Sequence, residues 1–270
     1  MSVSPSAYYK WKSGSSSQRF QENKHIASLI EKIHIDSPDK GYRRIHDDLE
    51  RFHNVHSNDK RILRICRSLG IQSTVKFHPA GCTRHARTPQ HYSENILNRE
   101  FHAEKPNEKW LTDVTEFKYY EGPRVKKVYL SAILDLYDRR IVAFAIRDTN
   151  DNKLVFDTFA KAVQRNPDAH PIFHSDRGFQ YTNRYFYQRL VNAGMIQSMS
   201  RVGRCIDNGP MEGFWGILKR ERYYGKRFTN RTELVKMIRS YIHYYNTKRL
   251  QRNLGVLTPM EKHDRYLKAD

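Results

Sequence analysis

The chain has 270 residues, of which 48 are Lys or Arg and 29 are Asp or Glu, giving a formal net charge of +19. Such an excess is typical of proteins that bind a polyanion, and it favours a nucleic acid partner over a merely solvated basic surface. Three scattered cysteines argue against a disulfide framework and indicate a reducing compartment. Charged residues interrupt the apolar stretch at 128–146, and the N-terminus lacks an apolar signal core. We therefore expect a cytoplasmic protein of about two domains, without a membrane span.

The first 72 residues predict a small all-α domain. Residues 1–22 are polar, and the serine-rich stretch 13–17 predicts a turn between short helical pieces. Three helical patterns follow, at residues 24–35, 41–53 and 58–69. Gly70 ends the third pattern, whose apolar face consists of Ile62, Ile65, Cys66 and Leu69.

The other side of this third helix is basic. A basic last helix in a three-helix unit suits a helix-turn-helix reader of the DNA major groove, although an ordinary solvated face has the same pattern. The candidate DNA-binding residues of this domain are Arg43, Arg44, Lys60, Arg61, Arg64 and Arg67.

Residues 73–104 contain scattered Pro and Gly among basic residues, and we interpret them as a basic linker. Three His and Cys residues lie close together in this segment and two histidines lie upstream of it, which raises the alternative of a zinc site. The pattern lacks a Cys-x-x-Cys pair, so polar and partly cationic residues near DNA are the favoured interpretation. The residues concerned are His53, His56, His78, Cys82 and His85.

Residues 105–265 alternate between strand and helix patterns. Strands are expected at 110–119, 126–136, 139–147, 171–175 and 195–199, and helices at 152–164, 183–193, 210–223 and 231–246. Three hairpin-connected strands followed by alternating helices and strands match an α/β fold of the ribonuclease H-like type, a mixed sheet flanked by helices. The helix-turn-helix-like domain would precede it.

Three carboxylates stand in distinctive local contexts. Asp113, in WLTDVTEF, lies within a β-branched and aromatic run that predicts a strand. Asp176, in HSDRGFQY, ends a short apolar strand before the chain-breaking pair Arg177-Gly178. Glu212 falls just inside a helix, after the cap and first-turn signal of residues 207–210. Side chains at strand ends commonly build sites in open α/β sheets.

Together these acids predict a divalent-metal site for phosphoryl transfer. Hard cations bind carboxylate oxygens and water, and two Mg²⁺ ions roughly 4 Å apart can hold the attacking and leaving oxygens of a phosphodiester. The spacing of 35 residues between Asp176 and Glu212 is weak evidence by itself, and strand-end carboxylates without a metal are the alternative. Lys219 lies seven residues after Glu212 on the same helical face, where it would contact a DNA phosphate or remain a solvated lysine.

Five ordered segments carry a resemblance to a known family. The segments are WLTDVT, VYLSAILDLYDRRIVAFAI, HSDRGFQY, DNGPMEGFWGILKRE and YYNTKRLQRNLGVLTPMEKH. From about residue 105 to 263 the chain resembles the catalytic half of the second-frame (OrfB) transposases of two-frame bacterial insertion sequences, relatives of the retroviral integrases. A looser similarity covers VSPSAYYKW and SPDKGYRRIHDDL in the first 72 residues.

The resemblance implies that Asp113, Asp176 and Glu212 are the catalytic and metal-binding triad and that Lys219 matches the family's basic position. It implies two Mg²⁺ ions, with Mn²⁺ as a substitute, and 3′-end cleavage followed by strand transfer through direct transesterification. A structure-specific nuclease and a non-catalytic DNA-binding regulator of transposition remain the alternatives.

The partners implied are double-stranded DNA, as element ends and target, and further copies of the chain assembled on that DNA in a bacterial nucleoid. Proteins of this family are commonly fused by frameshifting to an upstream product with a leucine zipper. Because no sustained heptad pattern is present, we expect this chain to be the downstream frame alone and mostly monomeric in free solution.

Overall fold

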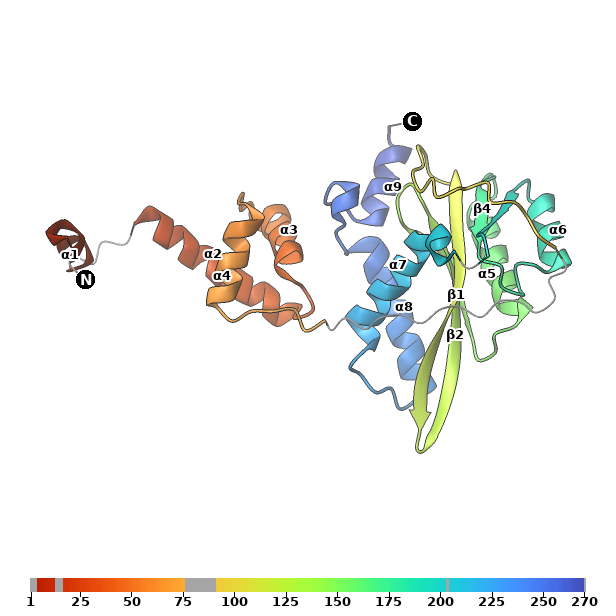
Figure 1. Cartoon of the computed structure of the whole chain (residues 1–270), viewed down its shortest axis with the longest axis horizontal. Coiled ribbons are helices and arrows are strands. Elements are labelled where there is room, and N and C mark those ends of the chain that lie inside the picture. The colour runs from red at the N-terminus through yellow and green to blue at the C-terminus, as the bar shows by residue number, and fades with distance from the viewer. Residues whose placement is uncertain (1–3, 13–16, 76–90, 203, 270) are drawn as a thin grey trace. The chain divides into compact units, whose positions relative to one another are not determined.

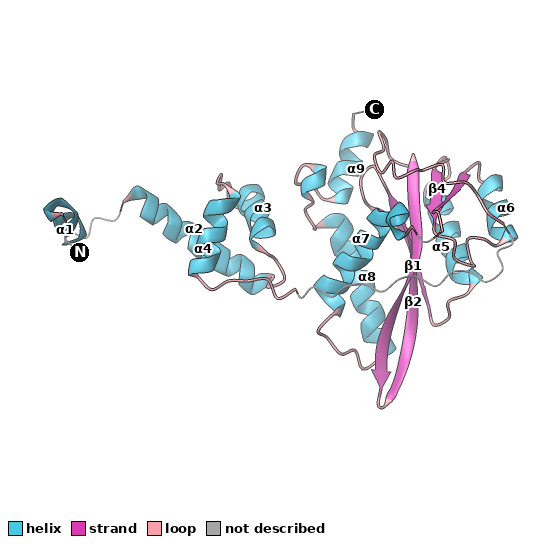
Figure 2. Cartoon of the chain, viewed as in Figure 1, coloured by secondary structure: helices cyan, strands magenta, loops and turns pink. Residues whose placement is uncertain are grey.

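The computed structural model describes residues 4–12, 17–75, 91–202 and 204–269. The chain divides into two compact units, residues 1–75 and 76–270 (Figures 1 and 2). Across the described ranges, no helix is long and apolar enough to cross a membrane.

The first unit consists of helices α1 (Pro5–Lys12), α2 (Gln18–Asp36), α3 (Tyr42–His53) and α4 (Asp59–Ser68). Helix α2 begins earlier than expected because the Ser17 side chain accepts a hydrogen bond from the Phe20 amide and caps it. Asn58 caps α4 in the same way. Apolar side chains of α2, α3 and α4 form one buried core, which includes Ile30, Leu49 and Ile62. The helical domain expected from the sequence is confirmed, whereas four residues of the expected serine-rich turn, 13–16, lie outside the described residues.

The second unit contains a five-stranded mixed sheet in the order β3-β2-β1-β4-β5. Strands β1 (Lys109–Glu121), β2 (Arg124–Asp135) and β3 (Ile141–Arg147) are antiparallel, whereas β4 (Ile172–Ser175) and β5 (Ile196–Met199) run parallel to β1. Helices α5 (Asn152–Arg165) and α6 (Arg184–Asn192) make the parallel connections. The ribonuclease H-like fold expected from the sequence is confirmed.

Helices cover both faces of this sheet (Figure 1). One hydrophobic cluster joins the sheet to α7 (Gly209–Leu218) and α8 (Arg231–Thr247), around Phe117, Phe214 and Tyr241. A second cluster joins the opposite face to α5 and α6, around Phe159, Phe173 and Phe186. The central strand β1 therefore lies between two packed layers.

Several boundaries differ from the expected ones. Strand β3 starts at Ile141 rather than 139 because Arg139 occupies a turn with φ of 62°. The single helix expected at 210–223 changes after Leu218 into a π-helical turn, η2 (Lys219–Tyr223). A short 3-10 turn, η1 (Cys205–Asn208), precedes α7, and another, η3 (Arg252–Leu254), follows α8. Residues 91–104, part of the expected linker, lie in the second unit, where Leu97 and Ala103 join its core.

Helix α9 (Pro259–Leu267) was not expected, although its signal is present in the sequence. The Thr258 side chain accepts from the Glu261 amide and the Glu261 carboxylate accepts from the Thr258 amide, which forms a capping box with Pro259 in the first turn. His263 of this helix contacts the buried carboxylate of Asp138, at 2.8 Å from Nδ1 to Oδ2.

The hairpin of β1 and β2 extends beyond its neighbours (Figure 1). The β1–β2 ladder continues to the pair Glu121 and Arg124, whereas β3 pairs with β2 only from Tyr129 to Leu134. Strand β4 pairs with β1 only over Lys109–Leu111. Residues from about 116 to 128 therefore form a two-stranded ribbon that leaves the sheet.

Candidate active site

Asp113 lies near the middle of β1, where Ala132 of β2 is its partner in the ladder. Its Oδ1 accepts a hydrogen bond from the Val114 amide at 2.7 Å, and its Oδ2 accepts one from Trp215 Nε1 of α7 at 3.1 Å. Both carboxylate oxygens are therefore held, one by its own strand and one by the helix that carries Glu212.

Asp176 follows directly after β4, whose parallel pairing with β1 places this strand end beside Asp113. Its Oδ1 accepts a hydrogen bond from the Gly178 amide at 2.9 Å. A Cβ at position 178 would lie 2.9 Å from the same oxygen, closer than real Cβ contacts. A side chain at position 178 would therefore displace the Asp176 carboxylate.

Glu212 lies in the first turn of α7, with an exposed side chain that has no hydrogen bond to the described parts of the chain. The preceding segment fixes the start of this helix. The side chain of Asn208, expected to cap α7, makes no cap hydrogen bond. Its Nδ2 instead donates to the Thr112 carbonyl of β1 at 3.0 Å, because η1 turns this side chain toward the sheet.

A buried ion cluster holds the residue before Asn208. Asp207 is fully buried and accepts hydrogen bonds from the Arg99 guanidinium at 2.6 Å and from Arg201 Nε at 2.9 Å. Asn95 Nδ2 also donates to it, at 3.1 Å. The hydrogen bond from Arg201, together with the other donors, holds the pKa of Asp207 well below its usual range. The charged carboxylate thus anchors the chain just before the Glu212 helix.

The three acids share an electrostatic environment. Burial, followed by the charge of Asp176, raises the pKa of Asp113 well above its ordinary value, and Glu212 adds to the effect. Burial and Asp176 likewise raise the pKa of Glu212. The fold therefore brings together three side chains that lie far apart in sequence. Within the described ranges, however, no three His, Cys, Asp or Glu side chains are placed so that they could hold a metal ion.

Lys219 lies at the junction of α7 and η2. Its ammonium group lies 5.2 Å from the centre of the Phe117 ring. Burial lowers its pKa, while the charges of Asp113 and Glu116 oppose that shift. Lys219 is therefore a partly buried lysine directed toward β1, rather than a freely solvated one.

The basic residues expected to contact DNA in the first unit fall into two groups. Arg44 pairs with Asp39 at 3.1 Å, and Arg61 donates to Asn23 at 2.9 Å and to Glu22 at 3.0 Å. These two guanidinium groups bind their own unit. The second group is exposed and consists of Arg43, Lys60, Arg64 and Arg67. Within this group, Arg43 also pairs with Asp59, at 4.0 Å from Nε to Oδ2, and lies 5.4 Å from the centre of the Tyr42 ring.

Only part of the expected histidine and cysteine cluster can be placed. His53 and His56 are exposed, whereas His78, Cys82 and His85 lie outside the described residues. The zinc alternative therefore gains no support from the described residues.

Comparison with known proteins identifies the class. An integrase core domain matches residues 103–205, a second integrase core model matches residues 212–267, and an HTH-like domain matches residues 21–77. The second unit is thus an integrase core of ribonuclease H-like fold.

Two relatives cover most of the chain. An uncharacterized transposase-like protein of Haemophilus influenzae is 42% identical over 76% of this chain and 93% of its own length. The putative transposase InsK for insertion sequence element IS150 of Escherichia coli is 35% identical over 94% of this chain and 87% of its own length. The chain belongs to the OrfB-like transposases of the IS3 family of insertion sequences. The resemblance inferred from its motifs is confirmed.

Among solved structures, the HTLV-2 integrase catalytic core domain in complex with magnesium is similar to this chain. The match has 18% sequence identity and a TM-score of 0.47, and it covers 60% of this chain and 99% of that one.

Proposed function

We propose that this transposase catalyses metal-dependent 3′-end cleavage and strand transfer at the ends of an insertion sequence. The observation that supports this proposal best is the convergence of Asp113, Asp176 and Glu212, each on a different element of the integrase core, into one electrostatic environment. Perturbed carboxylates with like-charged neighbours are typical of functional sites.

The donor set suits a hard divalent cation. The charge of Asp176 raises the proton affinity of both Asp113 and Glu212, so a bound cation would relieve this repulsion. Asp113 and Asp176 are each held by hydrogen bonds, whereas Glu212 is exposed and can rotate toward them. We propose that Mg²⁺, with Mn²⁺ as a substitute, completes the site by drawing Glu212 inward. When bound, two such ions would activate water for cleavage and the 3′-hydroxyl for joining.

The residues around the triad have distinct roles in this proposal. Trp215 and the Gly178 amide hold the two aspartates in place. Asn208 fixes the start of α7 against β1 and so limits where Glu212 can reach. Lys219 lies close enough to Asp113 for the charge of that aspartate to affect its pKa, and it would bind a phosphate beside the scissile bond.

Double-stranded DNA is the proposed partner, both as element end and as target. The HTH-like unit, with its exposed Arg43, Lys60, Arg64 and Arg67, would bind the element end. We further propose that pairing of two ends requires assembly of several copies on DNA, aided by fusion to an upstream-frame product. Light scattering and joining assays, with and without that fusion, test this assembly step.

The triad is tested by charge removal at nearly constant shape. Asp113→Asn, Asp176→Asn and Glu212→Gln should each abolish cleavage and joining of labelled end DNA in Mg²⁺, while end binding and thermal stability stay near wild type. Asp168→Asn, at an exposed aspartate, is the matched control. Substantial joining by a triad variant would remove that residue from the site. Cleavage without joining by the wild-type protein would instead indicate a nuclease, and binding without turnover a regulator.

A further inference from the structure

The hairpin of β1 and β2 carries a basic surface outside the carboxylate site. Lys118, Arg124, Lys126 and Lys127 are exposed on the two-stranded ribbon, and Lys226 and Arg227 are exposed on the loop that follows η2. We name these six residues the hairpin patch. We propose that the hairpin patch binds the phosphate backbone of the same DNA duplex whose scissile phosphate lies at the three carboxylates. This inference rests on the proposed function.

The loop belongs to this surface because it is bound to β1. The Tyr223 hydroxyl hydrogen-bonds the backbone of Lys118, at 2.8 Å from its amide and 3.1 Å from its carbonyl. The Tyr120 amide donates to the Phe228 carbonyl at 2.9 Å. The Arg227 guanidinium lies 4.9 Å from the centre of the Tyr120 ring. These contacts support the ribbon along one edge. An isolated two-stranded hairpin in water has no such support and is only marginally stable.

The charges of the ribbon are arranged unfavourably for the protein alone. Lys118 and Lys127 are direct partners in the β1–β2 ladder, and like charges opposite one another destabilise a sheet. Glu116 compensates through Lys127 at 2.9 Å, and Glu121 pairs with Lys126 at 2.6 Å. These pairs are about half exposed, so each contributes little to stability and phosphates can displace it.

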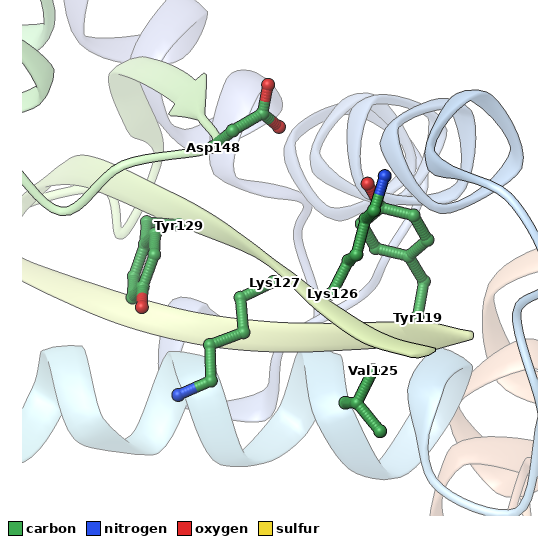
Figure 3. Close-up of a pocket in the computed structure, with 6 residues that line it drawn as sticks. All are labelled: Tyr119, Val125, Lys126, Lys127, Tyr129 and Asp148. Carbon is green, nitrogen blue, oxygen red and sulfur yellow. The ribbon is translucent and has the colours of Figure 1, made fainter. Parts of the chain in front are cut away.

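A hollow of about 430 Å³ lies beside the ribbon, where β3 no longer pairs with β2. Figure 3 shows the residues that line it. Lys126 and Lys127 lie at this hollow and extend to opposite sides of the strand, as successive residues of a strand do. Tyr119, Tyr129, Val125 and Asp148 complete the lining. Cationic side chains are therefore available on both sides of the ribbon. Their number on an exposed edge also disfavours strand pairing with a second copy of the chain.

The ribbon extends from the carboxylates over a length of several base pairs. The tip pair of Glu121 and Arg124 lies eight residues along β1 from Asp113, which corresponds to about 26 Å at ~3.3 Å per residue. A duplex rises about 3.4 Å per base pair, so this distance corresponds to about 8 base pairs. A duplex that runs along the ribbon would thus place its phosphates at the hairpin patch. Lys and Arg donate to phosphate oxygens, and such contacts hold a duplex without reading its sequence.

The test uses the full chain and an end duplex that extends well past the cleavage position on both sides. The hairpin variant is the triple Lys118→Ala, Lys126→Ala, Lys127→Ala. Its charge-matched control, Arg239→Ala, Arg265→Ala, Lys268→Ala, removes three exposed basic residues from α8, α9 and the turn after α9. The hairpin variant should lower the slope of log binding constant against log salt by about 2 to 3, at about 0.9 per lost phosphate contact. The control should change the slope by less than one such contact.

A second variant and a cross-link make the result decisive. The charge-retaining triple Lys118→Arg, Lys126→Arg, Lys127→Arg should keep the wild-type slope, and thermal unfolding verifies that each variant folds. A benzophenone side chain placed at Val125, which is 54% exposed, should cross-link to the end duplex about 8 base pairs from the scissile phosphate. Equal slopes in hairpin and control variants, or cross-links confined to target DNA, would overturn the inference. Failure of wild-type cleavage would instead refute the proposed function.

Discussion

The indole of Trp215 donates a hydrogen bond to the carboxylate of Asp113, at 3.1 Å from Nε1 to Oδ2, across 102 residues of sequence. This bond links the helix of Glu212 directly to the aspartate on β1. Because Trp215 sits one turn after Glu212 in α7, a displacement of the helix would disturb two of the three proposed metal ligands together.

Trp215→Phe removes the donor and keeps an aromatic ring beside Phe214. Since residues that orient a metal ligand typically contribute about 10–100-fold, we expect end cleavage to fall by that factor, with a higher Mg²⁺ concentration needed for half-maximal rate. Mg²⁺ titration of the cleavage rate measures this. If the half-maximal Mg²⁺ concentration were unchanged, Trp215 would contribute only packing and would not orient the metal ligand.

Gly178→Ala tests the close approach of the backbone to Asp176. The added Cβ would lie 2.9 Å from Asp176 Oδ1, so the carboxylate must move from its position. We expect cleavage to fall by about 10-fold or more. Circular dichroism should show the wild-type fold, because Gly178 lies in a loop after β4. Wild-type cleavage by Gly178→Ala would show that this position tolerates movement.

The Glu221 and Arg249 pair gives a stability prediction. Arg249 Nη2 donates to Glu221 Oε1 at 2.8 Å, the Tyr241 hydroxyl donates to Oε2 at 2.9 Å, and both charged side chains are nearly buried. Arg249→Met leaves a buried carboxylate without its counter-charge, so we expect unfolding to become easier by about 3–5 kcal/mol. The double variant Glu221→Gln, Arg249→Met should recover much of this loss. Urea unfolding of these two variants and of Glu221→Gln alone measures the coupling free energy. Fully additive changes would show that the two side chains do not stabilise each other.

Asp207 predicts a dependence of stability on pH. Hydrogen bonds from Arg201 and Arg99 hold its folded pKa below its unfolded value of about 3.9. A depressed carboxyl pKa stabilises the protein above the unfolded value, and that contribution is lost as pH falls toward the folded pKa. Asp207→Asn should therefore lower stability at neutral pH by about 1–3 kcal/mol, and the difference should shrink below about pH 4. Thermal melts of both proteins across this range measure it. A difference independent of pH would exclude the ionic cause.

Local sequence signals are enough to propose the three carboxylates as a site. Asp113, Asp176 and Glu212 stood out because a strand, a strand end and a helix start each leave a readable pattern. The contacts that orient these acids have no sequence pattern of their own. In sequence, Trp215 looks like an ordinary core residue and Asn208 like an ordinary helix cap. Only the fold shows that their donors reach Asp113 and the Thr112 carbonyl. By contrast, the capping box of α9 is legible in the sequence, so that helix was predictable.

Local sequence patterns also do not predict which strands pair in the sheet or which arginines form ion pairs in the first unit. The two-stranded ribbon of β1 and β2 begins where their pairing with β3 and β4 ends. Local sequence patterns do not define these end points. Basic residues on one helix likewise look the same in sequence whether they pair internally or face solvent. Arg61 and Arg64 illustrate the point, because only Arg61 finds an acid and an amide on α2.

This contrast gives the last prediction. Arg64 is exposed on α4, so Arg64→Ala should weaken the preference for element ends over random duplex by about 1–3 kcal/mol if it contacts a base. Arg61→Ala should leave that preference unchanged, because its guanidinium is engaged by Glu22 and Asn23. It should instead cost about 0–1 kcal/mol of stability, as expected for a partly exposed pair. Competition binding with end and random duplexes, alongside urea unfolding, separates the two effects. If Arg61→Ala reduced end preference as much as Arg64→Ala, the pair with Glu22 would open on DNA and both arginines would belong to the interface.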